Sequence, residues 1–179
     1  MADYYTRLMS AERIPLHVDP QRLSRTGARF NACVSMRDMG RLLPLLAAEP
    51  GDVTVGLEFD LDEMQRAYLR LQLQAEVVLV CQRCLSKMKQ SIVADRLLGL
   101  VCSEEQAERL PESYEPLLIT NEPLFLRDVI EDELILSLPI IARHADGECE
   151  LAVKKIVADT QASATQINPF AALAELNNH

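Results

Sequence analysis

The segment VTVGLEFDL, residues 53–61, alternates apolar and polar side chains, and LRLQLQAEVVL, residues 69–79, continues the same period of two over a longer run. Successive side chains of a β-strand point to opposite faces, so each segment predicts a strand with one buried and one solvated face. A third extended run covers residues 88–101. Three strands that follow one another along the chain favour an antiparallel meander.

Two other segments carry helical spacing. Apolar residues recur every three or four positions over 36–46, where Pro44 would end or kink a helix. A more regular stripe of apolar residues predicts a helix from about 123 to 137, capped by Thr120 or Asn121 and terminated by Pro139. The combination is typical of an α+β fold in which the meander packs against a few helices.

The two ends of the chain carry weaker signals. A short extended piece at 14–18 precedes a basic segment, 22–29, which we interpret as a loop or an edge strand. Near the other end, Asn168 and Pro169 predict the cap and first turn of a short tail helix over 168–176. We expect a single domain over 1–179, with the least defined pattern over 1–48.

Composition places the chain among ordinary soluble proteins. It has 179 residues, 49% of them hydrophobic, and needs no metal as a condition of folding, because a chain of this size buries roughly 70% of its unfolded surface. No apolar run reaches the ~18 to 20 residues that cross a bilayer, and the N-terminus lacks the apolar centre of a signal peptide. We therefore expect a cytoplasmic protein without a membrane partner.

The charge is divided unevenly along the chain. Residues 1–100 carry 13 basic and 12 acidic side chains, whereas residues 101–179 carry 5 basic and 15 acidic ones, and the whole chain has a formal charge of -9. Nucleic-acid affinity depends on Lys and Arg contacts, so any RNA-binding patch should lie in the first hundred residues. The acidic part suits a basic protein partner instead.

Cysteine usage points to free thiols or metal ligands. The number is odd, in a chain without an export signal, and this does not suit a disulfide framework. Cys81 and Cys84 form a C-x-x-C motif in the short link between two predicted strands, at the tip of a hairpin. Two thiolates at this spacing can share a Zn2+ ion, and His144 with Cys149 offers the other two ligands of a Cys3His site.

Two alternatives to zinc at the C-x-x-C motif stay open. A thioredoxin-like redox pair requires the motif between a strand and a helix, whereas here a strand is followed by a strand. The simpler alternative is a reduced turn whose sulfur atoms pack under the hairpin. Zn2+ is the only cofactor that we consider.

Basic residues gather in two groups. If these groups converge, they form a face that contacts phosphates, and the few aromatic residues then favour recognition of backbone and shape over base stacking. The alternative is the ordinary wet face of a strand. The candidate RNA-binding residues are Arg22, Arg25, Arg29, Arg83, Lys87 and Lys89.

The sequence gives little support for catalysis. It contains none of the common hydrolase, metalloprotease, P-loop or dinucleotide-binding motifs, and it has only three histidines. The successive carboxylates Glu131, Asp132 and Glu133 point in different directions on a helix, and we interpret them as a solvated face. We expect a protein that is not an enzyme and has no small-molecule substrate.

Four ordered blocks resemble one known family. They are Cys81-Gln-Arg-Cys84, SEEQAERLPESYEP at 103–116, VIEDELILSLP at 129–139 and NPFAAL at 168–173. On these blocks the chain resembles the YceD family, the large ribosomal RNA subunit accumulation proteins of bacteria and plastids. Many relatives carry further cysteines after the acidic helix, whereas this chain offers only His144 and Cys149 there.

The resemblance implies a non-enzymatic role in the synthesis, processing or stability of 23S rRNA, and hence in assembly of the large ribosomal subunit. It brings no catalytic residue with it. The first hypothesis is direct binding of 23S rRNA or of a precursor (pre-50S) particle. The alternative is a protein-binding adaptor that contacts a basic ribosomal protein through its acidic C-terminal half.

Overall fold

The computed structural model of the chain describes residues 14–119, 123–145 and 147–149. It divides into two compact units, which we name the sheet unit and the knuckle unit. The sheet unit consists of Met1–Leu79 with Lys89–Ile140, and the knuckle unit of Val80–Met88 with Ile141–His179. The expectation of one domain over 1–179 stays a prediction.

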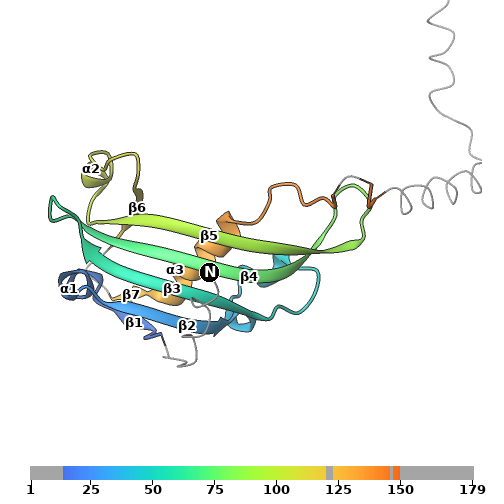
Figure 1. Ribbon diagram of the computed structural model, residues 1–179, viewed down its shortest axis with the longest axis horizontal. Helices are drawn as coiled ribbons and strands as arrows, with labels where there is room; N and C mark the ends of the chain where they lie inside the picture. Colours follow the sequence, from blue (N-terminus) through green and yellow to red (C-terminus); the bar gives the residue numbers. More distant parts are fainter. Residues whose placement is uncertain (1–13, 120–122, 146, 150–179) are drawn as a thin grey trace, which may run out of the picture. The chain divides into compact units, whose positions relative to one another are not determined.

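A five-stranded sheet forms the frame of the sheet unit (Figure 1). Strands β2 to β5 are neighbours in chain order, which confirms the predicted meander, and β6 adds to β5 in parallel. The sheet is therefore mixed, since the parallel strand β6 joins it. The strands are β2 (Arg29–Ser35), β3 (Asp52–Leu61), β4 (Ala67–Val80), β5 (Lys87–Val101) and β6 (Glu115–Leu118).

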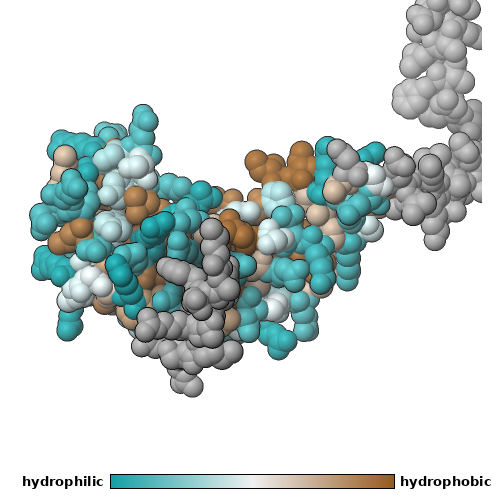
Figure 2. Space-filling model, in the orientation of Figure 1, coloured by the Kyte–Doolittle hydropathy of each residue, from teal (hydrophilic) through white to brown (hydrophobic). Residues whose placement is uncertain are grey.

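Apolar side chains at every second position of the strands form the buried face that the sequence predicts. On β3 the side chains of Val53, Val55, Leu57 and Phe59 are buried, while those between them are exposed or half-buried. Helix α3 (Leu126–Leu136) lies behind the sheet in Figure 1 and buries its own apolar stripe. The face turned to the viewer in Figure 2 is mostly hydrophilic, as expected of the solvated side of the strands.

The predicted helix over 123–137 starts three residues late. Leu124–Phe125 forms β7, which pairs with β1 (His17–Val18), and Phe125 takes the N-cap position of α3 without a side-chain hydrogen bond. The predicted caps at 120 and 121 lie outside the described residues, as does the tail helix at 168–176. Among the described residues, no helix has the length and apolar character needed to cross a membrane.

Two N-terminal expectations were wrong in detail. Arg22 and Arg25 of the basic segment lie on a helix, α1 (Pro20–Thr26), which Asp19 caps and Gly27, at φ 61°, ends in the left-handed conformation. Arg29 begins β2, an edge strand of the sheet, so the alternative of an edge strand holds for that residue. The predicted helix over 36–46 is two short 3-10 turns, η1 (Met36–Asp38) and η2 (Leu43–Leu45). Pro44 prevents an α-helix from continuing there.

The carboxylates at 131–133 were also misread as a solvated face. Glu131 and Glu133 are 5% and 6% exposed, and only Asp132 points to solvent. Glu131 bonds to the loop around Arg41, and Glu133 lies 3.4 Å from Arg96 on β5. Spacing on a helix does not reveal such partners, because both arginines are distant in sequence.

Candidate metal centre

The knuckle unit is built on a tight turn between β4 and β5. The backbone N–H of Cys81 donates to the carbonyl of Ser86, and the N–H of Leu85 donates to the carbonyl of Cys81, both at 2.9 Å. Leu85 adopts φ 60°, a left-handed conformation that closes the turn. The turn buries both cysteine side chains and leaves Arg83 and Leu85 exposed.

A second segment of the knuckle unit supplies the other two candidate ligands. The N–H of Gln82 donates to the carbonyl of Ala142 at 2.8 Å, which joins the turn to the segment that follows Ile141. This bond places His144 and Cys149 beside the turn. The ligand atoms of Cys81, Cys84, His144 and Cys149 all lie within 4.8 Å of one another.

The spacing of these atoms fits a tetrahedral ion. The sulfur atoms of Cys81 and Cys149 are 3.6 Å apart, and Nδ1 of His144 lies 3.5 Å from the sulfur atoms of both Cys84 and Cys149. Zinc holds sulfur at about 2.3 Å, so two ligands of one tetrahedron are separated by about 3.8 Å. The four residues therefore form a cluster that could hold a metal ion.

The cluster lowers the pKa of two thiols. Burial alone would raise the pKa of Cys81, but backbone N–H groups of His144, Cys84 and Arg83 and the imidazole of His144 lower it to about 5. The hydroxyl and the N–H of Ser86 lower the pKa of Cys84. Thiolates are the form in which cysteine binds metals, so the turn prepares both residues as ligands.

The pKa values of the other two candidate ligands, His144 and Cys149, are raised. Hydrogen bonding to Cys81 raises the pKa of His144, although burial opposes this. Burial and the neighbouring sulfur atoms of Cys81 and Cys84 raise the pKa of Cys149 to about 11. A metal that binds all four residues must therefore displace protons, as is general for Cys and His sites.

The surroundings do not favour the redox alternative. A reactive C-x-x-C pair of the thioredoxin type starts a helix, whose N-terminus stabilises the thiolate. Here Cys81 follows β4, and the turn leads directly into β5. The thiolate of Cys81 is stabilised by backbone N–H groups of the turn and by His144 instead.

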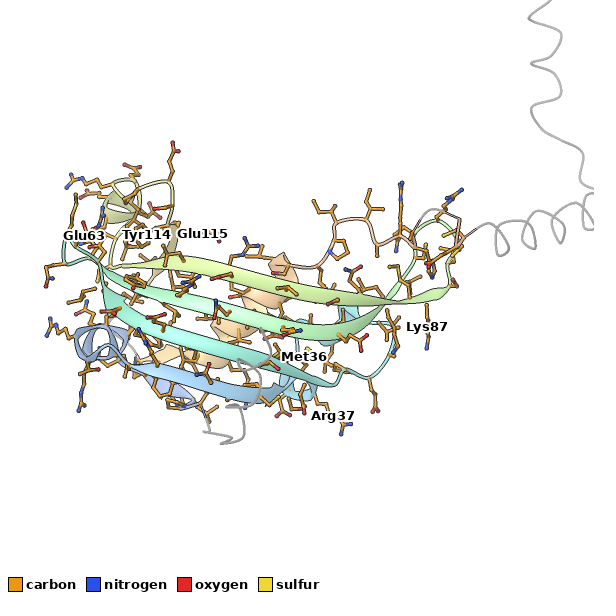
Figure 3. All side chains as sticks on the ribbon, viewed as in Figure 1. Met36, Arg37, Glu63, Lys87, Tyr114 and Glu115 are labelled. Atoms are coloured by element: carbon orange, nitrogen blue, oxygen red, sulfur yellow. The ribbon has the colours of Figure 1, made fainter. Side chains whose placement is uncertain are left out.

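The candidate RNA-binding residues are distributed over both units. Arg83 and Lys87 lie exposed in the knuckle unit, and the side chain of Lys87 projects from the ribbon in Figure 3. Arg22 and Arg25 are exposed on α1 and Lys89 on β5, all in the sheet unit. Arg29, at the start of β2, forms an ion pair with Glu58 at 2.5 Å.

Sequence reasoning missed two residues of the knuckle. Arg143 is exposed next to the candidate ligand His144, and the hydroxyl of Ser86 lies 3.0 Å from the sulfur of Cys84. Arg143 belongs to the acidic half of the chain, where we expected no RNA contact. Both could have been found from their positions in the sequence, because Arg143 directly precedes His144 and Ser86 lies two residues after Cys84.

Comparisons with known proteins agree with the resemblance. The family model described as "Large ribosomal RNA subunit accumulation protein YceD" matches residues 69–177. A curated protein of that name from Haemophilus influenzae (strain ATCC 51907 / DSM 11121 / KW20 / Rd) is 31% identical over 172 residues, 94% of this chain and 98% of that protein. No solved structure matches the chain. The chain therefore belongs to the YceD family of large ribosomal RNA subunit accumulation proteins.

Proposed function

We propose that the chain is a non-enzymatic factor for the synthesis, processing or stability of 23S rRNA, and that it binds this RNA or a pre-50S particle directly. Membership of the YceD family supports the link to the large subunit. The observation that carries direct binding is the C-x-x-C turn, which buries its two thiols and exposes the arginine between them.

In this proposal the metal is Zn2+, held by Cys81, Cys84, His144 and Cys149. Four protein ligands complete a tetrahedron and leave no open position for substrate or water, which is the arrangement of structural zinc sites. The ion would supply no reaction chemistry and would fix the two segments of the knuckle unit to each other. The donor set of three thiols and one imidazole suits zinc.

The exposed basic side chains of the knuckle unit are suited to contact phosphates. Among the residues that the structure describes, Arg83, Lys87 and Arg143 make no ion pair, so their charges are available to a ligand. The same holds in the sheet unit for Arg22 and Arg25 on α1 and for Lys89 on β5. Arg29 is the weakest of the predicted contacts, because Glu58 already neutralises it.

Crosslinking followed by RNA sequencing in cells tests this proposal. The wild type should enrich 23S over 16S segments, and R83E/K87E should lose most of that enrichment. The matched control is R37E/R109E, which makes the same change of charge at exposed positions of the sheet unit and should behave like the wild type.

Binding to a purified 23S fragment under varied salt gives an independent readout. The slope of log K against log salt should become shallower by about 0.9 for each duplex phosphate that the variant no longer neutralises. Equal 23S enrichment and equal salt slopes for R83E/K87E and the wild type would refute the proposed surface. Crosslinks to 16S alone would refute the link to the large subunit.

A further inference from the structure

A groove in the sheet unit lies outside everything proposed so far. Its volume is about 250 Å3, and it is formed where β6 ends and α3 begins. Two of its large apolar side chains stay open to solvent, Leu118 at 52% and Phe125 at 46% exposed. The residues that line it are Leu117, Leu118, Ile119, Leu124, Phe125 and Val129, together with Pro123, Asp128 and Asp132.

Among residues 14–119, 123–145 and 147–149, no strand pairs with the edge of β6 that faces away from β5. In the part of the chain that the structure describes, β6 is the last strand in the order of its sheet, and β5 is its one neighbour. The N–H of Ile119 donates to the carbonyl of Val101 on the β5 side at 2.7 Å. Alternate residues of a strand direct their N–H and C=O groups to opposite sides, so those of Leu118 point away from β5. An open edge of this kind accepts a further strand.

The negative charge at the groove favours a partner with basic side chains. Asp132 is bound to Arg41, but the exposed carboxylate of Asp128 has no cationic partner within the described ranges 14–119, 123–145 and 147–149. Asp128 lies in the first turn of α3 and lines the groove. An apolar groove with one free carboxylate fits an extended segment that combines apolar side chains with Lys or Arg.

We propose that this groove binds an extended peptide of a partner protein, with alternating apolar and basic residues, as an additional strand beside β6. The apolar side chains of the peptide pack against Leu118, Leu124 and Phe125, and a Lys or Arg pairs with Asp128. The inference rests on the proposed function in one respect, because it takes the partner from the proteins of the large subunit, whose contacts with RNA require such basic segments.

Overlapping 12-residue peptides that tile the large-subunit proteins of the same organism provide the probes. The full chain is titrated into each labelled peptide and binding is followed by fluorescence anisotropy. Peptides with alternating apolar and basic residues should bind, and Asp128→Lys should weaken them at least tenfold. Glu76→Lys, the same charge reversal at an exposed position on β4, is the matched control and should change binding less than twofold.

N-methylation of the best peptide tests strand addition without altering the protein. Methyl groups on one set of alternate amides should abolish binding, whereas methyl groups on the other set should leave it unchanged, because only one set faces β6. Absence of any peptide that binds below 100 µM, equal loss in the two charge-reversal variants, or equal effects of both methylation patterns would each overturn the proposal.

Failure here is distinguishable from failure of the proposed function. R83E/K87E should keep the affinity of the wild type for the peptide while it loses most of its 23S enrichment. Peptide binding by a wild-type chain that does not crosslink to 23S rRNA would leave the groove in place and refute the RNA-binding role.

Discussion

The carboxylate of Glu131 accepts hydrogen bonds from the backbone N–H groups of Arg41 and Leu42, at 2.6 and 3.0 Å, and from the guanidinium of Arg41 at 3.2 Å. Glu131 is buried on α3, and the two N–H groups belong to the loop between η1 and η2. A side chain of the helix therefore accepts hydrogen bonds from backbone N–H groups of a loop some ninety positions earlier in the chain. The side chain of an N-cap residue does the same for the free N–H groups of its own helix.

Glu131→Gln should destabilise the sheet unit measurably. The substitution keeps one acceptor oxygen but removes the charge that faces two N–H groups and a guanidinium, and hydrogen bonds to charged groups contribute about 1.5 to 3 kcal/mol. We expect a loss of about 2 kcal/mol in the free energy of unfolding by urea. The control Asp132→Asn removes the exposed partner of the same arginine and should cost less than about 1 kcal/mol. Equal losses in the two variants would contradict this role of Glu131.

The stabilisation by Glu131 should depend on pH. Burial raises the pKa of this carboxyl, but the N–H groups of Leu42 and Arg41 and the guanidinium of Arg41 together lower it below its usual value. Stabilisation by a group with a lowered pKa is present above its unfolded pKa, about 4.3 for Glu, and is lost as pH falls through the folded value. The difference in unfolding free energy between wild type and Glu131→Gln should be constant from pH 6 to 8 and shrink below about pH 4.5. A difference that grows on acidification would refute this assignment.

How much of the fold the sequence predicts depends on how local the deciding interactions are. β3, β4 and β5 could be predicted because apolar and polar side chains alternate within the sequence of each strand. β6 could not, since its four residues include Pro116 and it is held by pairing with β5. The loop around Arg41 escaped prediction for the same reason, because its backbone is satisfied by Glu131 on α3.

In the candidate site, too, local features could be predicted and contacts between distant residues could not. The C-x-x-C spacing identifies Cys81 and Cys84 as a pair, and elimination leaves His144 and Cys149 as the only nearby pair to complete the set. That all four ligand atoms come within 4.8 Å depends on the bond between Gln82 and Ala142, which no local pattern encodes. The role of each basic residue was less predictable, since an ion pair such as Arg29 with Glu58 appears only when two strands are in register.

The purified chain should contain about one zinc ion, and Cys84→Ser should lose it. Three ligands with one hydroxyl no longer form the closed set of sulfur and nitrogen donors that structural zinc requires. Elemental analysis gives the metal content, and Cys102→Ser, at an exposed cysteine outside the cluster, is the control that should keep the ion. Equal zinc contents in the two variants would exclude the proposed site.

Removal of the proposed zinc ion should loosen the knuckle unit without unfolding the sheet unit. The sheet unit has its own apolar core, built on residues such as Phe59 and Leu71, and does not contain the four ligands. After chelation, amide hydrogen exchange should accelerate over 81–86 and 141–149, while β3 keeps its protection. Simultaneous loss of protection in β3 would show that the two units unfold together.

The packing of the segment between α2 (Glu104–Ala107) and β6 against the sheet depends on Gly99, and Gly99→Val should disturb it. A Cβ atom at this position would lie 2.8 and 3.0 Å from the two methyl groups of Leu110 and 3.4 Å from Cβ of Tyr114. The larger side chain of valine must displace the side chain of Leu110, and overpacking of this kind costs about 1 to 3 kcal/mol.

The matched control for Gly99→Val is Ser91→Val, which introduces the same side chain at an exposed position of the same strand, β5. Valine is favourable in strands, so this control should unfold at the same urea concentration as the wild type or at a slightly higher one. Gly99→Val should unfold at a lower concentration, and exchange at the amides of 108–114 should rise first, because Leu110 and Tyr114 lie next to the new side chain. A variant as stable as the control would show that the segment yields to the added volume without loss of packing.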